Sequence, residues 1–336
     1  MAVREQSGFD WQTRLGVCTY SYGIHWRAAR SGTADLSFSN PLEFMDLCHG
    51  LGAAGIQLGI GTDFKLAEQI QSKRESYGMY FEGQVSLPKE DGDVDRFEQE
   101  VRAAKTAGAR VVRAAALSGR RYETFDSEKA FREFAVNAER SIQRAEPVLK
   151  RHGVKLALEN HKDWRVDELL GLLKRIDSEY VGICVDTGNS IALLEDPMEV
   201  IRAYGPFALS VHLKDMGVRP YAEGFLLSEV PLGEGLLDIP AAVGIILKAN
   251  PKVWLSLEMI TRDPLKASCL LPKYWVAMGG VPAKDLAAML GLVLRNDSTK
   301  PLPSTTGLEL GTQLALEDDH VRRSFAFAQF GPAKNE

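Results

Sequence analysis

The sequence is poor in cysteine and contains no long apolar run. Its four cysteines are widely spaced along 336 residues and form no CxxC pair, which argues against a disulfide framework or a structural zinc site. No segment approaches the roughly 20 apolar residues that a membrane-spanning helix needs. The N-terminal residues do not resemble a signal peptide. We therefore expect a cytoplasmic protein with free thiols and no membrane partner.

Positive charge is not in excess either. Lysine and arginine number 40 against 45 aspartates and glutamates, so the formal net charge is −5 at pH 7. Proteins that bind nucleic acid normally present a basic face to the phosphates. We expect a small-molecule partner, a sugar or polyol, rather than nucleic acid. The C-terminal segment is a candidate contact for a homo-oligomer.

Short apolar runs alternate with amphipathic segments, a pattern typical of a parallel sheet with helical crossovers. Eight runs read as strands, and eight is the number that a closed (β/α)₈ TIM barrel requires. The predicted fold is an α/β TIM barrel over residues 1–263, followed by a helical or irregular C-terminal extension over 264–336 that packs on it. The eight predicted strands are residues 15–20, 55–60, 79–87, 109–117, 154–160, 180–187, 208–215 and 253–260.

The segments between the strands carry helix signals. Asn40 and Pro41 have the composition of an N-cap followed by proline at the first helical position. Apolar residues recur at helical spacing over 97–106 and 131–151, and a glycine follows each segment. Residues 166–176 and 239–248 show the same pattern.

The last four predicted strands each end in an ionisable residue. Alternate residues of a strand face opposite sides, so the aliphatic residues of these strands share one face and the ionisable residues the other. Barrels of this kind place their chemistry at the carboxyl ends of the strands. We expect Glu159, Asp186, His212 and Glu258 to meet there. The alternative is that they are unrelated polar groups at strand ends.

Three facing carboxylates repel one another unless they are protonated or bind a cation. One divalent metal ion bound by Glu159, Asp186, His212 and Glu258 resolves this conflict. An oxygen-rich set with one histidine favours Mn²⁺ first, with Mg²⁺, Co²⁺ or Zn²⁺ as the alternatives, and argues against a structural Zn²⁺ site. Such an ion acts as a Lewis acid and stabilises an enediolate.

The same segments resemble the xylose isomerase-like barrel superfamily, which includes ketose 3-epimerases, inosose dehydratases, hydroxypyruvate isomerases and endonuclease IV. The resemblance implies a sugar isomerase or epimerase in which Glu159, Asp186, His212 and Glu258 hold the metal. It also implies that Glu159 and Glu258 serve as the acid/base pair on opposite faces of the substrate. The matching segments are LALENH, CVDTGN, SVHLKD, VPLGEGLLDIPA and LSLEM.

Two positions depart from the sugar epimerases. Asn189 stands where they often have histidine, and Arg165 stands where they tend to have glutamate. These departures keep open a lyase or dehydratase that acts on an inosose or a 3-keto-glycoside through the same metal-stabilised enolate. Phosphodiester hydrolysis and non-catalytic ligand binding are further alternatives. With six histidines, the chain is poorly equipped for the metal cluster of endonuclease IV.

Further residues near the predicted mouth are candidates for substrate binding. Asn189 is one of them, and Arg113 is a candidate for an anionic group such as phosphate. For each residue, a local hydrogen bond, a salt bridge or simple solvation is the alternative. The candidates are His25, Arg113, His161, Asn189, Lys214 and Arg219.

Overall fold

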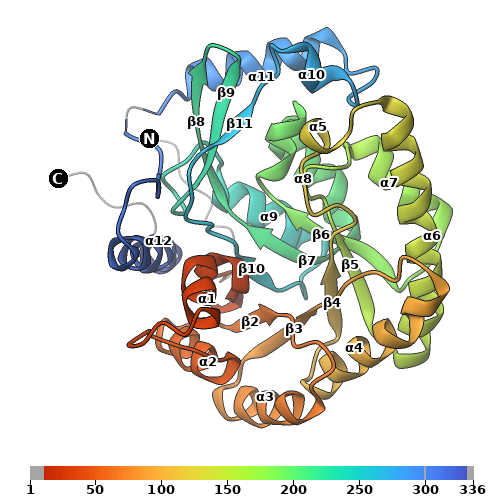
Figure 1. Ribbon diagram of the computed structural model, residues 1–336, viewed down its shortest axis with the longest axis vertical. Helices are drawn as coiled ribbons and strands as arrows, with labels where there is room; N and C mark the ends of the chain where they lie inside the picture. Colours follow the sequence, from red (N-terminus) through yellow and green to blue (C-terminus); the bar gives the residue numbers. More distant parts are fainter. Residues whose placement is uncertain (1–10, 299, 331–336) are drawn as a thin grey trace.

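The computed structural model describes residues 11–298 and 300–330 and contains a closed, parallel, eight-stranded barrel (Figure 1). The order around the barrel is β1-β10-β7-β6-β5-β4-β3-β2. Every strand lies within one of the eight predicted runs, so the predicted TIM barrel is confirmed. The strands are β1 (Leu15–Cys18), β2 (Gly55–Leu58), β3 (Tyr80–Gln84), β4 (Val111–Ala114), β5 (Lys155–Glu159), β6 (Val181–Asp186), β7 (Ala208–Leu213) and β10 (Leu255–Leu257).

Helices surround the barrel (Figure 1). Asn40 caps the first of the longer helices, because its side chain accepts hydrogen bonds from the backbone N–H groups of Leu42 and Glu43 at 3.0 and 3.1 Å. The helices that precede the last barrel strand are α1 (Gly23–Arg30), α2 (Pro41–Gly50), α3 (Phe64–Tyr77), α4 (Val94–Thr106), α5 (Arg121–Thr124), α6 (Glu128–His152), α7 (Val166–Ile176), α8 (Pro197–Tyr204) and α9 (Ile239–Ala249). Short 3₁₀ turns are η1 (Trp11–Arg14), η2 (Thr19–Tyr22), η3 (Asp91–Asp93), η4 (Asn189–Leu193) and η5 (Gly205–Phe207).

The strand register brings the predicted ionisable residues to one end of the barrel. Glu159 pairs with Cys184 across β5 and β6, and Asp186 pairs with His212 across β6 and β7. Glu258 follows the last residue of β10, which itself pairs with β7. All four residues therefore stand at the carboxyl ends of adjacent strands.

A second, antiparallel sheet was not expected from the sequence. It consists of β8 (Asp215–Tyr221), β9 (Gly224–Val230) and β11 (Leu265–Ala267), in the order β11-β9-β8. Only Lys214 separates β7 from β8, so the hairpin continues directly from the barrel strand. Because β11 pairs with β9, the sheet crosses the predicted boundary at Asp263. The division into a barrel and an extension stays a prediction.

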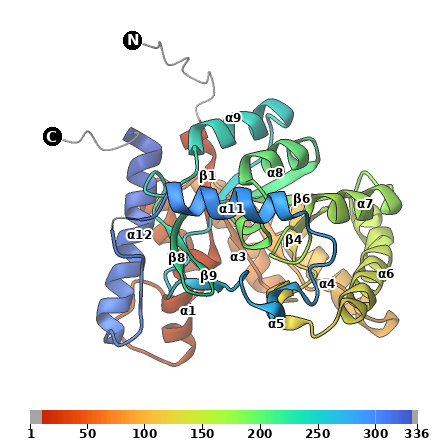
Figure 2. The same cartoon turned by 90° about the horizontal axis from the view of Figure 1, so that it is seen from above.

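The C-terminal region adds three helices, α10 (Pro272–Trp275), α11 (Ala283–Arg295) and α12 (Leu310–Phe330). Figure 2 shows α11 lying across the small sheet, where it contacts β8 and β9. Helix α12 packs beside α1. Its buried Glu317 accepts hydrogen bonds from the backbone N–H groups of Ile24 at 2.7 Å and His25 at 3.0 Å.

The sequence predicted no membrane-spanning helix and predicted free thiols rather than disulfides. Within 11–298 and 300–330, no helix has the length and apolar character that crossing a membrane requires. Cys18, Cys48, Cys184 and Cys269 are all buried free thiols, as the sequence predicted.

Candidate metal centre and active site

Four side chains converge at the carboxyl end of the barrel. Glu159, Asp186, His212 and Glu258 are all buried, and one potential ligand atom from each lies within 4.8 Å of the others. The structure thus brings together the four residues that the sequence singled out. Three carboxylate oxygens and one imidazole nitrogen form a donor set that suits a divalent cation.

The histidine of this set is oriented by a glutamine. His212 Nε2 lies 2.7 Å from Gln57 Oε1, and Gln57 Nε2 donates to Glu82 Oε2 at 3.0 Å and to Ser210 Oγ at 3.2 Å. Because Gln57 Oε1 is therefore the acceptor, His212 carries a proton on Nε2. His212 Nδ1 is buried without a hydrogen-bond partner, 3.2 Å from Glu258 Oε1. Burial opposes protonation, but Cys184 and the carboxylates of Glu258 and Glu159 raise the pKa of His212 well above its usual value, so Nδ1 directs a proton toward the carboxylates. A metal ion bound by this histidine would take the place of that proton.

Two buried cations contact the carboxylates. Lys214 Nζ lies 2.8 Å from Asp186 Oδ2 and 2.5 Å from Glu258 Oε2. Arg113 donates to Glu159 Oε2 from Nε at 2.6 Å and also from Nη2. Burial raises the pKa of Asp186 to about 6, although Lys214 opposes this shift. The crowded carboxylates thus attract positive charge, as their mutual repulsion requires.

Glu159 receives hydrogen bonds on both of its carboxylate oxygens. Its Oε2 accepts from Arg113, and its Oε1 accepts from Asn189 Nδ2 at 3.2 Å. Burial opposes ionisation, but Arg113 and then His212 hold the pKa of Glu159 well below its ordinary value. Both oxygens of Glu159 therefore receive donors that favour the carboxylate form.

Asn189 connects this carboxylate to two lysines. Its Oδ1 accepts from Lys162 Nζ and lies 3.5 Å from Lys214 Nζ, while its backbone N–H donates to Asp186 Oδ1 at 2.8 Å. Lys162 is buried with a φ of 65°, a conformation that L-residues rarely adopt. Burial and then the neighbouring Lys214 lower the pKa of Lys162 to about 8. Such strain is often found at functional sites.

Glu229 and Arg262 form a second ion pair next to Lys214. Glu229 is fully buried on β9 and lies 3.8 Å from Lys214 Nζ. Arg262 donates to Glu229 from Nη2 at 2.5 Å and from Nε at 3.1 Å. The contact with Glu229 agrees with the salt bridge that was the alternative role of Lys214, whereas the role of Arg262 was not predicted.

The other predicted substrate contacts are placed differently. His161 Nδ1 lies 2.9 Å from the Leu117 carbonyl oxygen, and burial lowers the pKa of this imidazole to about 4. Arg219 lies on β8 and donates from Nη2 to the Ser298 and Lys300 carbonyls at 2.6 and 3.0 Å. The structure does not bring Arg219 to the cluster, because β8 leads away from the barrel end.

His25 also lies outside the cluster. Its Nδ1 is 2.8 Å from Glu317 Oε2, and its ring stacks on Phe38 with centroids 5.4 Å apart. It belongs to the contact between α1 and α12. His25 and Arg219 therefore both lie away from the four-residue cluster.

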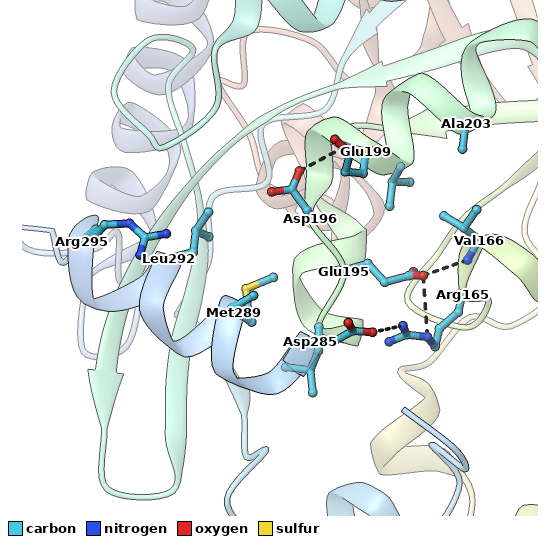
Figure 3. Close-up of a pocket in the computed structure, with 13 residues that line it drawn as sticks. Arg165, Val166, Glu195, Asp196, Glu199, Ala203, Asp285, Met289, Leu292 and Arg295 are labelled. Atoms are coloured by element: carbon cyan, nitrogen blue, oxygen red, sulfur yellow. Dashed lines mark hydrogen bonds and ion pairs between the residues drawn. The ribbon is translucent and has the colours of Figure 1, made fainter. Parts of the chain in front are cut away.

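Arg165, the second departure from the epimerase pattern, faces an outer pocket (Figure 3). It donates to Asp285 Oδ2 at 2.9 Å and lies 3.6 Å from Glu195 Oε1. This pocket lies between α7, α8 and α11 rather than at the four-residue cluster. Arg165 thus joins the C-terminal region to the barrel helices.

Three polar residues inside the barrel were missed by the sequence analysis. Gln57 and Glu82 orient His212, and Cys18 Sγ lies 3.9 Å from Glu258 Oε1. Each residue interrupts an otherwise apolar or small-residue strand. Extending the alternation argument to the first three strands would have identified them as facing the interior.

The fold and the cluster together define a TIM barrel with a candidate metal-ligand set at the carboxyl ends of its strands. The sequence matches the xylose isomerase-like TIM barrel family over residues 45–275, and the chain belongs to that family. This membership confirms the resemblance inferred from the sequence motifs. Enzymes that include sugar epimerases and isomerases share this fold.

Two solved structures illustrate the similarity of fold. A D-psicose 3-epimerase in the presence of D-fructose superposes with a TM-score of 0.61 and 14% identity, covering 95% of this chain and 100% of the other. The IOLI protein with a bound zinc atom has a TM-score of 0.55 and 14% identity, covering 85% and 100%. At this level of identity, the similarity shows the fold alone.

One curated relative is closer in sequence over a limited stretch. It is a 3-oxo-isoapionate decarboxylase from Pectobacterium atrosepticum, 35% identical over 97 residues. These residues are 28% of this chain, and the match spans 35% of the length of the relative.

Proposed function

We propose that this chain is a metal-dependent lyase that converts a keto-sugar derivative through an enolate. One observation carries the choice of lyase over epimerase: both oxygens of Glu159 are engaged, by Arg113 and by Asn189. A two-base epimerisation needs two carboxylates that can each accept and release a proton. Glu159 is fixed by directed hydrogen bonds to both of its oxygens, so we assign the proton transfer to Glu258, whose Oε2 contacts Lys214 and whose Oε1 lies 3.2 Å from His212 Nδ1.

Glu159, Asp186, His212 and Glu258 would hold the divalent ion, with Mn²⁺ as the first expectation. When bound, the ion supplies Lewis-acid stabilisation of negative charge on the substrate oxygens. Glu258 is the proposed base, with Oε1 as the atom that receives the proton. Lys214 stays protonated beside Glu258 Oε2 and provides a positive charge near the enolate.

Two lyase reactions use such an enolate. In elimination, Glu258 takes the proton from the carbon beside the ketone, and the C–O bond at the next carbon breaks with release of an alcohol or water. In decarboxylation, the electrons of the C–C bond pass to the ketone, carbon dioxide leaves, and the carbon then takes a proton. The partial match to a decarboxylase supports the lyase proposal but does not choose between these reactions.

Several of the predicted substrate contacts belong to this proposal. Arg113, His161 and Lys214 border the carboxylate cluster, and Asn189 lies between Glu159 and the lysines. Arg113 and Lys214 carry positive charge, which suits a substrate that becomes anionic during the reaction. His161 is neutral near pH 7, because burial lowers its pKa to about 4.

Isomerisation or epimerisation is the second candidate. It is favoured by the convergence of Glu159 and Glu258 within the same set of ligand atoms. In that case, Glu159 would have to leave the hydrogen bonds from Arg113 and Asn189 during turnover.

The test is incubation of Mn²⁺-loaded protein in D₂O with keto sugars, inososes, 3-keto-glycosides and 3-keto sugar acids. An unsaturated product, a released alcohol or carbon dioxide supports the lyase. Deuterium gained at carbon without loss of mass supports the second candidate and overturns the first. The Glu258→Gln variant, which keeps the shape of the side chain, serves as the inactive control for elimination, the reaction in which Glu258 takes a proton from carbon.

A further inference from the structure

A large cleft opens beside the candidate metal centre. Its volume is about 1010 Å³, and it runs between the ends of β3 and β4 and the helix α6. Tyr20, Gln84 and Arg113 form its inner end, near the cluster. The outer part is lined by residues that include Lys89, Ser118, Glu133, Phe134 and Asn137.

Side chains at the inner end of the cleft contact the proposed metal ligands or the residue that orients one of them. Arg113 donates to Glu159, and Gln84 Nε2 donates to Gln57 Oε1 at 3.1 Å, the atom that orients His212. Arg113 uses Nε and Nη2 on Glu159, and its Nη1 makes no hydrogen bond with any residue of the described ranges. Arg113 thus both lines the cleft and contacts the cluster, so the cleft ends beside the proposed metal ligands.

The cleft is larger than a single sugar ring requires. Its volume reaches the upper end of the range of roughly 300–1,000 Å³ that is usual for sites of drug-sized ligands. Small side chains keep it wide, because Gly59, Ala115, Ala116, Ala130 and Ala138 form part of its wall.

The wall has the mixed chemistry that recognises carbohydrate. Tyr20 exposes 40% of its surface at the inner end, and the Arg113 guanidinium lies over its ring at 5.6 Å from the centroid. An exposed aromatic ring fixed in this way offers a surface on which the apolar face of a sugar can pack. Hydroxyl and amide groups, including those of Ser118 and Asn137, provide donors and acceptors further out.

We propose that this cleft binds a second sugar ring, so that the preferred substrate is a keto-glycoside rather than a free keto-monosaccharide. The proposal rests on the proposed function, because the reacting end of the substrate is placed at the cluster. It assigns the reacting ring to the metal centre and the linked ring to the space between Arg113 and α6.

A cleft-filling substitution tests this assignment. Asn137→Trp introduces a bulky side chain from an exposed position on α6, and Val136→Trp places the same side chain at the adjacent exposed residue, which does not line the cleft. Isothermal titration of the Mn²⁺-loaded protein with cellobiose and with glucose measures occupancy without turnover. We expect cellobiose to bind at least about tenfold more tightly than glucose, and Asn137→Trp but not Val136→Trp to remove this difference.

Kinetics then separate the two proposals. With a 3-keto-disaccharide and the matching 3-keto-monosaccharide, Asn137→Trp should raise KM about tenfold for the disaccharide and leave the monosaccharide within about twofold. Equal binding of cellobiose and glucose, or an equal effect of Asn137→Trp on both keto substrates, overturns the proposal of a second sugar ring. If the keto substrates are still turned over, the lyase proposal stands in that case. If neither keto substrate reacts, the proposed function fails, and the cellobiose titration alone decides whether the cleft binds a second sugar ring.

Discussion

His212 Nε2 lies 2.7 Å from Gln57 Oε1, and this contact turns His212 Nδ1 toward the carboxylates of Glu258 and Glu159, 3.2 and 3.5 Å away. Gln57 is itself fixed, because its amide nitrogen donates to Glu82 and Ser210. The barrel interior thus determines which imidazole nitrogen faces the cluster. Such outer contacts orient metal ligands and raise their basicity.

Replacing Gln57 should weaken metal binding although Gln57 is not a ligand. In Gln57→Leu, His212 loses the acceptor that fixes its ring and its proton. We expect the dissociation constant for Mn²⁺ to rise by about 10- to 100-fold, measured by isothermal titration. Gln71→Leu, on the exposed face of α3, is the control and should leave the affinity unchanged. Unaltered affinity in Gln57→Leu would show that the contact has no such role.

Glu82 should make stability depend on pH. Burial raises its pKa to about 7, against hydrogen bonds from Ser210 and Gln57. Between about pH 4.5 and 7 the folded chain keeps this proton while the unfolded chain releases it, so stability falls as pH rises through this window. The contribution is about 3 kcal/mol.

The measurement compares the free energy of unfolding of the wild type and Glu82→Gln in urea with EDTA, at pH 5 and pH 8. The wild type should lose about 2.5 kcal/mol relative to the variant between these two values. Parallel pH profiles in the two proteins would mean that Glu82 ionises as easily in the folded chain as in the unfolded one.

The Arg113–Glu159 pair should matter most when no metal is bound. Arg113→Met leaves a buried carboxylate without its cation, and we expect a loss of about 3–5 kcal/mol in the free energy of unfolding in EDTA. Saturating Mn²⁺ should recover part of this loss by binding the folded state. Arg132→Met removes an exposed pair with Glu128 and should cost less than about 0.5 kcal/mol. Equal losses in the two variants would contradict this account.

Glu317 should fix α12 to the barrel. Its carboxylate accepts from the N–H groups of Ile24 and His25 and contacts the His25 ring at 2.8 Å. Glu317→Ala leaves these donors buried without a partner, so we expect a loss of about 3 kcal/mol in urea unfolding. Glu309→Ala, at an exposed position before the helix, should be neutral. A neutral Glu317→Ala would mean that α12 is not held by this contact.

The sequence predicted the barrel and the four converging residues for one physical reason. Strand alternation and the carboxyl-end rule are local, so Glu159 and Asp186 could be placed at the same end without any knowledge of tertiary contacts. The small sheet was missed because β8 follows β7 after a single residue, and the two were read as one strand and a loop. Without β8 and β9, neither the position of Arg219 nor that of Glu229 could be predicted.

The hydrogen-bond partners of His25 and Lys162 were harder to predict, because they come from distant segments of the chain. His25 stands near the end of the first strand, yet its ring nitrogen contacts the carboxylate of Glu317, which lies 292 residues further along the chain. Lys162 adopts a left-handed backbone conformation and donates to Asn189, 27 residues further along the chain. Neither outcome is encoded in the periodicity of one segment.

Mn²⁺ binding to the metal-free protein tests the central claim most directly. Titration followed by electron paramagnetic resonance should show one Mn²⁺ per chain, with an electron spin-echo signal from one imidazole nitrogen. That signal should disappear in His212→Gln, and Asp186→Asn should weaken the binding. Absence of stoichiometric binding in the wild type, or an imidazole signal that persists in His212→Gln, would contradict the assignment of the metal centre.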